Sequence, residues 1–180
     1  MLFRSNRDYE ARLEAFVGEA LAHKEFMQQF HLHRAPLVEI GRRKALAQLV
    51  LKLTIPGVPD IYRGAEDWEQ SFVDPDNRRP VDFADLEKRL QQPRAGVDDK
   101  LIVTRTLLNL RRAKPALFAR GGYEPLDRGE GVLVFRRALA EEEMVVCVAV
   151  TAGVDVSLAP DEADWHSHLP AGPARVLTRG

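Results

Sequence analysis

The chain has 180 residues, 45% of them hydrophobic, and its 26 Lys and Arg against 27 Asp and Glu give a formal net charge of −1. This balance excludes a strong overall field of either sign, so the composition predicts no nucleic-acid partner and no anionic membrane partner. The single cysteine, Cys147, excludes an intrachain disulfide and favours a reducing, cytoplasmic location, and the longest apolar run, Met144–Val150, is far shorter than the roughly 20 residues of a membrane span.

The first half of the chain is predicted to be helical. Asn6 or Asp8 can cap a first helix, because apolar residues at helical spacing follow from Leu13 to Leu21. A second, short apolar stripe begins at Phe26. We expect that second helix to end at Pro36, since proline disrupts the hydrogen bonding of a helix interior.

A third apolar pattern starts at Leu37 and should end at the Pro-Gly-Val-Pro of residues 56–59. Residues 58–62 form a short apolar stretch that is a candidate for a buried strand. Residues 63–81 are rich in charge, contain glycine and proline, and show little periodicity, which predicts a long loop. Long loops in compact domains are usually functional or disordered.

Two further helices are predicted before the pattern changes. One should begin at Asp82 or Asp85 and end before Pro93, and Asp98 should cap another that runs to about Ala113. Beyond that point, glycines separate short β-rich runs, which predicts an α+β fold with a division near residue 116. The expected strands are Val132–Arg137, Met144–Val150, Val154–Leu158 and Arg175–Leu177.

Three segments resemble the α-amylase family of glycoside hydrolases. Residues 49–66 contain a sequence similar to the family's Pro-Gly-x-Pro-x-x-Tyr-x-Gly-x-Glu pattern at its eighth strand, with Arg63 where the family has Gln. Residues 71–83 resemble, more narrowly, the malto-oligosyltrehalose synthases of this family. Residues 107–118, with 121–125, are similar to the last barrel helix and the entry into the C-terminal sandwich.

The resemblance implies an α+β chain made of the helices and last strand region of a (β/α)8 barrel, followed by a small antiparallel β-sandwich. Residues 1–115 would form the C-terminal part of the catalytic barrel, with a substrate loop at 56–83, and residues 116–180 the sandwich. A complete barrel takes about 250 residues. The family's three catalytic carboxylates lie on the fourth, fifth and seventh strands, so the resemblance implies that this chain has no catalytic residue and is inactive alone.

Enzymes of the synthase type convert the reducing-end α-1,4 linkage of a malto-oligosaccharide into an α,α-1,1 linkage, an intramolecular transglycosylation in trehalose biosynthesis. The resemblance implies this reaction for a longer parent enzyme, without a metal or organic cofactor. Two alternatives remain open. The chain could be a non-catalytic carbohydrate-binding or assembly module, or part of another amylase-family hydrolase or transferase. Because barrel helices without their strands expose an apolar face, we also expect the isolated chain to form a homodimer or to rearrange the packing of its helices.

The loop supplies the candidate site, because sugar hydroxyls need both donors and acceptors and a cluster of Asp, Asn and Arg offers both. Without the resemblance, the acidic residues of this loop indicate a solvated loop. With the resemblance, they indicate the rim of a substrate cleft. These residues are Asp60, Glu66, Asp67, Glu69, Asp74 and Asp76. Arg78 matches an Arg-x-Pro element that borders the acceptor side in the family. The alternative is that Arg78 or Arg79 pairs with Asp74 or Asp76 and orders the loop. The candidate malto-oligosaccharide-binding residues are Tyr62, Glu66, Trp68, Asp74, Asp76, Asn77 and Arg78.

Two of these candidates have plain structural alternatives. Tyr62 could be a buried, hydrogen-bonded aromatic, and the indole of Trp68 could pack at an interface and bind no sugar. Glu66 is a candidate for holding another group across the cleft. Four of the five histidines form two i, i+2 pairs. His31 and His33 would point to different faces of a helix, and His166 and His168 have no third ligand nearby, so no metal site is predicted.

Overall fold

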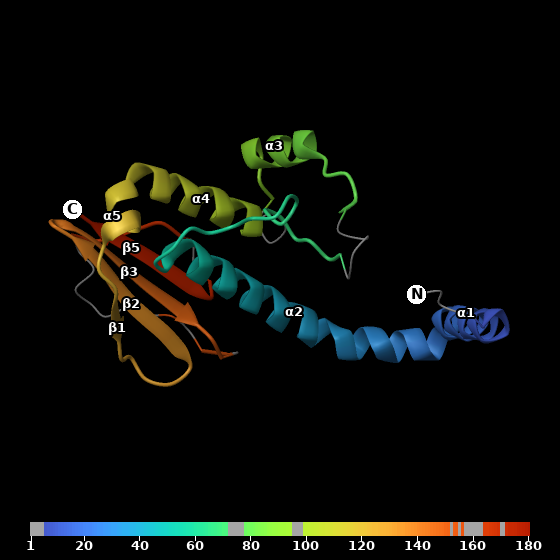
Figure 1. Ribbon diagram of the computed structural model, residues 1–180. Coiled ribbons are helices and arrows are strands. Elements are labelled where there is room, and N and C mark those ends of the chain that lie inside the picture. The colour runs from blue at the N-terminus through green and yellow to red at the C-terminus, as the bar shows by residue number, and fades with distance from the viewer. Residues whose placement is uncertain are drawn as a thin grey trace. The chain divides into compact units, whose positions relative to one another are not determined.

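The computed structural model describes residues 6–71, 78–94, 99–151, 153, 154, 156, 164–169 and 172–180. The chain forms two compact units, Met1–Arg42 and Arg43–Gly180 (Figure 1). Its fold combines helices with an antiparallel sheet, as the sequence predicts. None of the described helices is long and apolar enough to cross a membrane.

The first unit consists of α1 (Arg7–Ala22) and the first part of α2 (Lys24–Thr54). Asn6 caps α1, as predicted, and its side-chain oxygen accepts a 3.1 Å hydrogen bond from the backbone N–H of Tyr9. No residue of α1 is buried. The apolar side chains of this unit are exposed instead, namely Tyr9, Leu13, Phe16, Val17, Leu21, Phe26, Phe30, Leu32, Leu37 and Val38.

The predicted helix end at Pro36 is wrong, because α2 continues through this proline to Thr54. A proline in a helix interior removes one hydrogen bond, normally made to the carbonyl four residues earlier, and costs about 3 kcal/mol. Here that carbonyl belongs to Leu32, whose side chain is 62% exposed. Water can reach this side of the helix and hydrogen-bond the freed carbonyl, so the cost is reduced and the helix is not interrupted.

The second unit begins with the last turns of α2, which bury Leu49, Val50 and Leu53. The helix ends at Thr54, directly before the predicted Pro-Gly stop at residue 56. The following residues 58–62 form no strand, contrary to expectation, and Val58 is 97% exposed. Hydrophobicity suggested a buried strand here, but no described strand pairs with this stretch, and strands are stable only when a neighbour satisfies their backbone groups.

The two helices predicted next are confirmed as α3 (Phe83–Gln91) and α4 (Asp99–Ala113). A short helix that was not predicted, α5 (Pro115–Arg120), follows them. Asp82 caps α3, since its carboxylate accepts a 2.9 Å hydrogen bond from the backbone N–H of Asp85. The predicted cap of α4, Asp98, lies outside the described residues.

The described strands form one antiparallel sheet in the order β1-β2-β3-β5-β4. These strands are β1 (Glu124–Leu126), β2 (Val132–Leu139), β3 (Glu142–Ala149), β4 (His166–Ser167) and β5 (Ala174–Arg179). Three of the expected strands are thereby confirmed as β2, β3 and β5. The fourth expected strand, at 154–158, falls largely outside the described residues. Val156, which is described, is buried. The division into domains at residue 116 stays a prediction.

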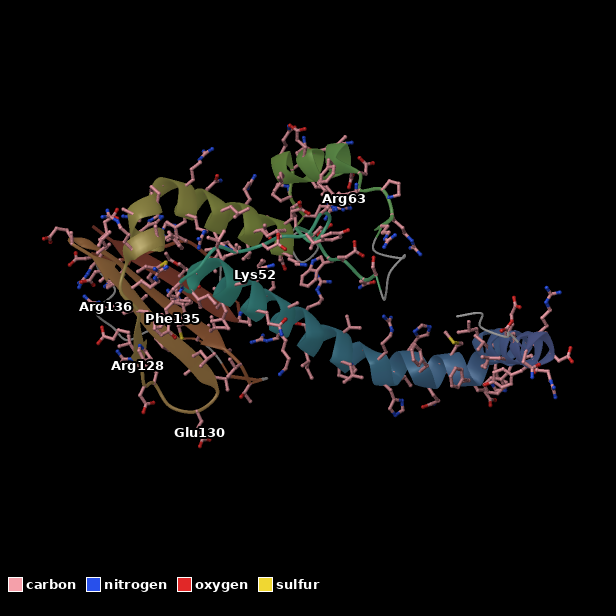
Figure 2. The ribbon with its side chains drawn as sticks, in the orientation of Figure 1. Lys52, Arg63, Arg128, Glu130, Phe135 and Arg136 are labelled. Atoms are coloured by element: carbon pink, nitrogen blue, oxygen red, sulfur yellow. The ribbon has the colours of Figure 1, made fainter. Side chains whose placement is uncertain are left out.

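Both faces of the sheet carry buried apolar side chains, because the side chains of β2 alternate between them. Phe135 (Figure 2) packs into the main core with Leu53, Leu107 and Leu117 from α2, α4 and α5. Its neighbour Val134 points to the opposite face, where it joins a smaller cluster with Cys147, Ala149 and Val156. The last turns of α2 and the helix α4 are therefore fixed to the sheet, and the loop between α2 and α3 starts from a rigid base.

Candidate functional site

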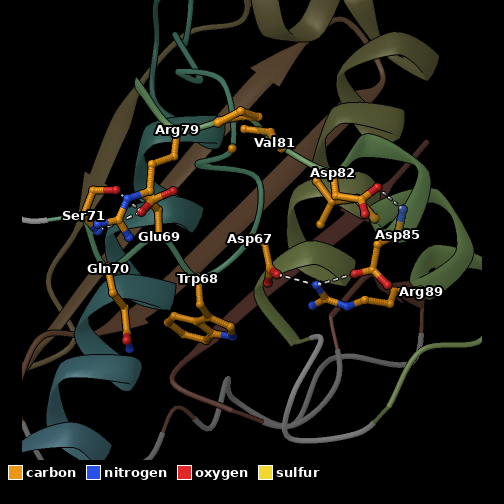
Figure 3. Close-up of a pocket in the computed structure, with 13 residues that line it drawn as sticks. Asp67, Trp68, Glu69, Gln70, Ser71, Arg79, Val81, Asp82, Asp85 and Arg89 are labelled. Atoms are coloured by element: carbon orange, nitrogen blue, oxygen red, sulfur yellow. Dashed lines mark hydrogen bonds and ion pairs between the residues drawn. The ribbon is translucent and has the colours of Figure 1, made fainter. Parts of the chain in front are cut away.

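A pocket of about 570 Å³ lies between the loop that follows α2 and the helix α3 (Figure 3). Its walls come from three segments of the second unit: the loop, the short approach to α3, and the first turns of α3 itself. Most of the lining side chains are polar or charged. The lining residues are Gly64, Asp67, Trp68, Glu69, Gln70, Ser71, Arg79, Pro80, Val81, Asp82, Asp85, Leu86 and Arg89.

Gly64 allows the loop to approach the segment before α3. Its φ of +90° lies in a region that side chains disfavour. A Cβ atom at this position would lie 2.9 Å from Cγ2 of Val81 and 3.5 Å from a carboxylate oxygen of Glu69. The glycine of the family-like motif is thus required by the close approach of two pocket walls.

Ion pairs and short hydrogen bonds fix the loop to itself and to α3. Arg89 of α3 lies between two carboxylates, with its Nη1 2.7 Å from Asp67 Oδ2 and 3.5 Å from Asp85 Oδ2 (Figure 3). The carboxylate of Glu69 accepts two hydrogen bonds from Ser71, one from its backbone N–H at 2.7 Å and one from its hydroxyl. These contacts hold the acids of the loop in a defined arrangement.

Two side chains of the helix α4 donate hydrogen bonds to the backbone of the same loop. The Thr104 hydroxyl shares its proton between the carbonyl oxygens of Glu66, at 3.2 Å, and Lys100, at 2.8 Å. The ammonium of Lys100 donates a 2.7 Å hydrogen bond to the carbonyl of Asp67 and lies 5.7 Å from the centre of the Trp68 ring. The backbone just before Trp68 is therefore held at two successive residues.

Burial lowers the pKa of Lys100, and the positive charge of Lys52 lowers it further. The neighbouring carboxylates of Asp67, Glu69 and Glu66 act in the opposite direction and raise this pKa. The lysine therefore occupies a partly desolvated position among acids, where its charge interacts more strongly than it would in water.

Two carboxylate oxygens at the site are buried and accept no hydrogen bond within the described part of the chain, Oε2 of Glu66 and Oδ1 of Asp67. A buried acceptor without a donor costs about 1–3 kcal/mol. A ligand hydroxyl or a water molecule that donates to these oxygens would recover that cost. Asp67 also lines the pocket, so this buried oxygen lies directly behind the pocket wall.

The structure brings only part of the predicted site together. Trp68 lines the pocket and Glu66 is two positions before it in the chain, whereas Tyr62 is 56% exposed and is not part of the lining. Arg78 is exposed and adjoins the lining residue Arg79. The predicted residues Asp74, Asp76 and Asn77 lie outside the described residues. Among the described residues, no three His, Cys, Asp or Glu side chains gather as a metal site.

Sequence reasoning did not select Arg89, Asp82 or Asp85 as site residues. All three lie on or beside α3, where Asp82 and Asp85 were considered only as the start of a helix. Arg89 is 22 positions from its partner Asp67 in the chain. No local pattern identifies such a pair, but the helical spacing of Asp85 and Arg89 does indicate that they share a face of α3.

No protein-family model matches the chain. A Mycobacterium tuberculosis protein assigned as a maltooligosyl trehalose synthase is 45% identical over 100 residues, which cover 52% of this chain and 12% of the relative. A cyclomaltodextrin glucanotransferase of Niallia circulans is 28% identical over 154 residues, covering 82% of this chain and 20% of the relative. A crystal structure of maltooligosyl trehalose synthase superposes with a TM-score of 0.82 and 28% identity, covering 98% of this chain and 27% of that one. The chain thus spans a minor part of each relative.

Proposed function

We propose that this chain, which similarity in sequence and structure identifies as one part of a maltooligosyl trehalose synthase, supplies one wall of that enzyme's substrate cleft. The observation that carries the proposal is the superposition of nearly the whole chain on a solved synthase. Active sites of barrel enzymes lie at the C-terminal face, where the loops after the strands meet. The motif at 56–66 and the pocket beside it fit the loop after the eighth strand.

In this proposal α2, α3 and α4 belong to the end of a catalytic barrel, and the sheet from β1 to β5 belongs to a C-terminal β-sandwich. The complete enzyme would break the reducing-end α-1,4 linkage of a malto-oligosaccharide and form an α,α-1,1 linkage within the same molecule. Glycosidic bond cleavage needs one carboxylic acid to protonate the leaving oxygen and one carboxylate to stabilise the sugar cation. We assign both to the rest of the enzyme. A cytoplasmic location remains part of the proposal.

The pocket has the chemistry that a sugar requires. Arg79, Gln70 and the indole N–H of Trp68 are donors, while Asp67 and Glu69 are acceptors. The flat face of Trp68 offers apolar surface for the C–H side of a glucose ring. We therefore propose that the pocket orients the malto-oligosaccharide and takes no part in proton transfer.

A non-catalytic carbohydrate-binding module is the second candidate. The pocket favours it, because a polar pocket beside an aromatic side chain can bind sugar without a catalytic dyad. Another amylase-family transferase is the third, since a cyclomaltodextrin glucanotransferase is also similar over most of the chain. Analysis of the products that the complete protein forms from maltopentaose separates these possibilities, because only the synthase yields a non-reducing sugar of unchanged length.

The chain's two tryptophans allow a direct test of sugar binding. We expect maltohexaose to shift the indole N–H resonance of Trp68 in a ¹⁵N-labelled sample, with a dissociation constant on the order of 1 mM. The resonance of Trp165, which packs against Arg179 at the sheet, should stay in place and serves as an internal control. Trp68→Leu, followed by its backbone amide resonances because it lacks this indole, should weaken binding roughly two- to tenfold, as expected for the loss of an aromatic contact of about 0.5–1.5 kcal/mol.

Cellohexaose, which has β-1,4 linkages, is the matched ligand for specificity. Equal shifts with both sugars would contradict a malto-oligosaccharide site. Shifts at Trp165 but not at Trp68 would place any sugar binding elsewhere on the second unit.

The exposed apolar stripe on α1 supports the predicted homodimer of the isolated chain. Leu13 and Phe16 are 47% and 68% exposed, and such surfaces are normally covered by other protein. We expect sedimentation equilibrium to detect a dimer. Phe16→Glu should raise its dissociation constant by roughly tenfold or more, because burial of an aromatic side chain stabilises by about 1.5–3 kcal/mol. The control Glu19→Gln, an exposed polar change on the same helix, should leave the dimer intact; a strict monomer before any substitution would contradict the proposal.

A further inference from the structure

We infer that Lys100 is a positioning residue that holds the indole ring of Trp68 in the orientation the pocket uses. This inference concerns the unliganded chain, and it rests on the proposed function only where it is extended to sugar binding. The lysine is not part of the pocket lining, and it belongs to α4, 32 positions after Trp68 in the chain.

The first observation is the double contact that Lys100 makes. Its Nζ donates a 2.7 Å hydrogen bond to the carbonyl of Asp67, the residue directly before Trp68, and it also lies 5.7 Å from the centre of the Trp68 ring. A cation at this distance from an aromatic centre is attracted to the face of the ring. One ammonium group thus fixes both the backbone that leads into Trp68 and the side chain itself.

The second observation is the rigidity of the base. Lys100 lies in the first turn of α4, whose buried residues Leu101, Val103, Leu107 and Leu110 pack against the second unit's interior. One turn later, Thr104 lies 3.2 Å from the carbonyl of Glu66. The helix therefore holds two successive peptide groups of the loop, and Lys100 also contacts the tryptophan ring.

The electrostatic surroundings keep the ammonium in this place. The charges of Asp67, Glu69 and Glu66 favour its protonated form, in opposition to burial and to Lys52. A neutral side chain of similar length would fill the same space without attracting the ring. Substitution by methionine therefore isolates the effect of the charge on Trp68.

The test uses the Trp165→Phe chain, in which Trp68 is the only tryptophan. Without sugar, Lys100→Met should shift the Trp68 emission maximum and increase iodide quenching, because the ring loses one of its contacts and becomes more mobile. Lys100→Arg should restore values near those of the parent. In the same samples, Lys100→Met should weaken maltohexaose binding about three- to tenfold, in line with a cation–π contact in a partly desolvated site.

Thr104→Val is the matched comparison, since it removes the other anchor of the loop without touching the ring. It should leave emission and quenching closer to the parent than Lys100→Met does. Unchanged emission and quenching in Lys100→Met would overturn the inference. If maltohexaose fails to bind the parent chain, the proposed sugar site falls, but the emission and quenching data still decide the role of Lys100.

A measurement on the unaltered chain covers the case in which Lys100→Met does not fold. The ε-methylene protons of Lys100 should resonate upfield of their usual position, because the ring current of Trp68 shields protons over its face. Trp68→Leu should return them to the ordinary value. Resonances at the ordinary position in the parent chain would contradict the contact and the inference together.

Discussion

Replacing Arg137 by methionine should lower the free energy of unfolding by about 3 kcal/mol, within a range of roughly 2–5 kcal/mol. Arg137 lies on β2 and is 1% exposed. Its guanidinium donates to four backbone carbonyls: to Phe118 at 3.1 Å, Gly121 at 3.0 Å, Thr54 at 3.4 Å and Gly122 at 3.5 Å. The side chain thereby joins the sheet to the ends of α2 and α5.

The size of this effect follows from the acceptors that would be left behind. Each buried carbonyl without a donor costs about 1–3 kcal/mol, and two of the four bonds are short. Part of this cost is offset, because the substitution also removes a charge that is poorly solvated. Burial and the nearby charge of Arg111 both lower the pKa of Arg137. Arg111 itself remains over the Phe118 ring, at 4.7 Å, and continues to donate to the carbonyl of Leu53 in α2 and to that of Gly57 beyond its end.

Arg136 provides the matched control on the same strand. Its side chain points to the other face and pairs with Glu124 at 3.1 Å and Glu143 at 2.6 Å, with 37% of its surface exposed. Exposed ion pairs contribute about 0–1 kcal/mol, so Arg136→Met should lower the stability far less. Urea unfolding of the two variants, followed by circular dichroism, measures the difference. Equal losses would show that the carbonyl network of Arg137 does not hold the helices to the sheet.

Local chemistry explains which parts of the fold could be predicted. Asn6 and Asp82 cap helices through bonds to residues three positions away, and the Pro-Gly at 56 ends α2, so each signal acts within one turn. The alternation of Val134 and Phe135 likewise needs only the two-residue period of a strand. The helix end predicted at Pro36 was wrong, because it depends on solvent access. The candidate strand at 58–62 has no partner among the described strands.

The site shows the same limit. Trp68 was selected because its neighbours in the chain are acids, whereas Gly64 was not selected although it lies in the family-like motif. The ion pair of Asp67 with Arg89 and the bond from Lys100 to the Asp67 carbonyl join residues 22 and 33 positions apart. Such pairs arise only when α3 and α4 pack beside the loop, and no local pattern of the sequence indicates that packing.

In the complete synthase that we propose, Arg78→Ala should lower kcat/KM for maltopentaose by roughly ten- to a hundredfold. Arg78 is exposed next to Arg79, which lines the pocket, so its guanidinium is accessible to a sugar on the rim. Hydrogen bonds that involve a charged group contribute about 1.5–3 kcal/mol, and a loss of this size in the transition state gives the stated range. The melting temperature should change little, because exposed substitutions usually alter stability by less than about 0.5 kcal/mol.

Arg112→Ala is the control for this prediction, since it removes an exposed arginine from α4 that does not line the pocket. It should leave both kcat/KM and the melting temperature close to those of the parent enzyme. The competing interpretation is that Arg78 orders the loop by pairing with its acids. A lowered melting temperature with unaltered kinetics would support that interpretation, because an arginine that only orders the loop contributes to the folded state before any sugar arrives. A loss in kcat/KM at constant stability instead requires a contact that forms with the bound sugar, which is the role we propose for Arg78.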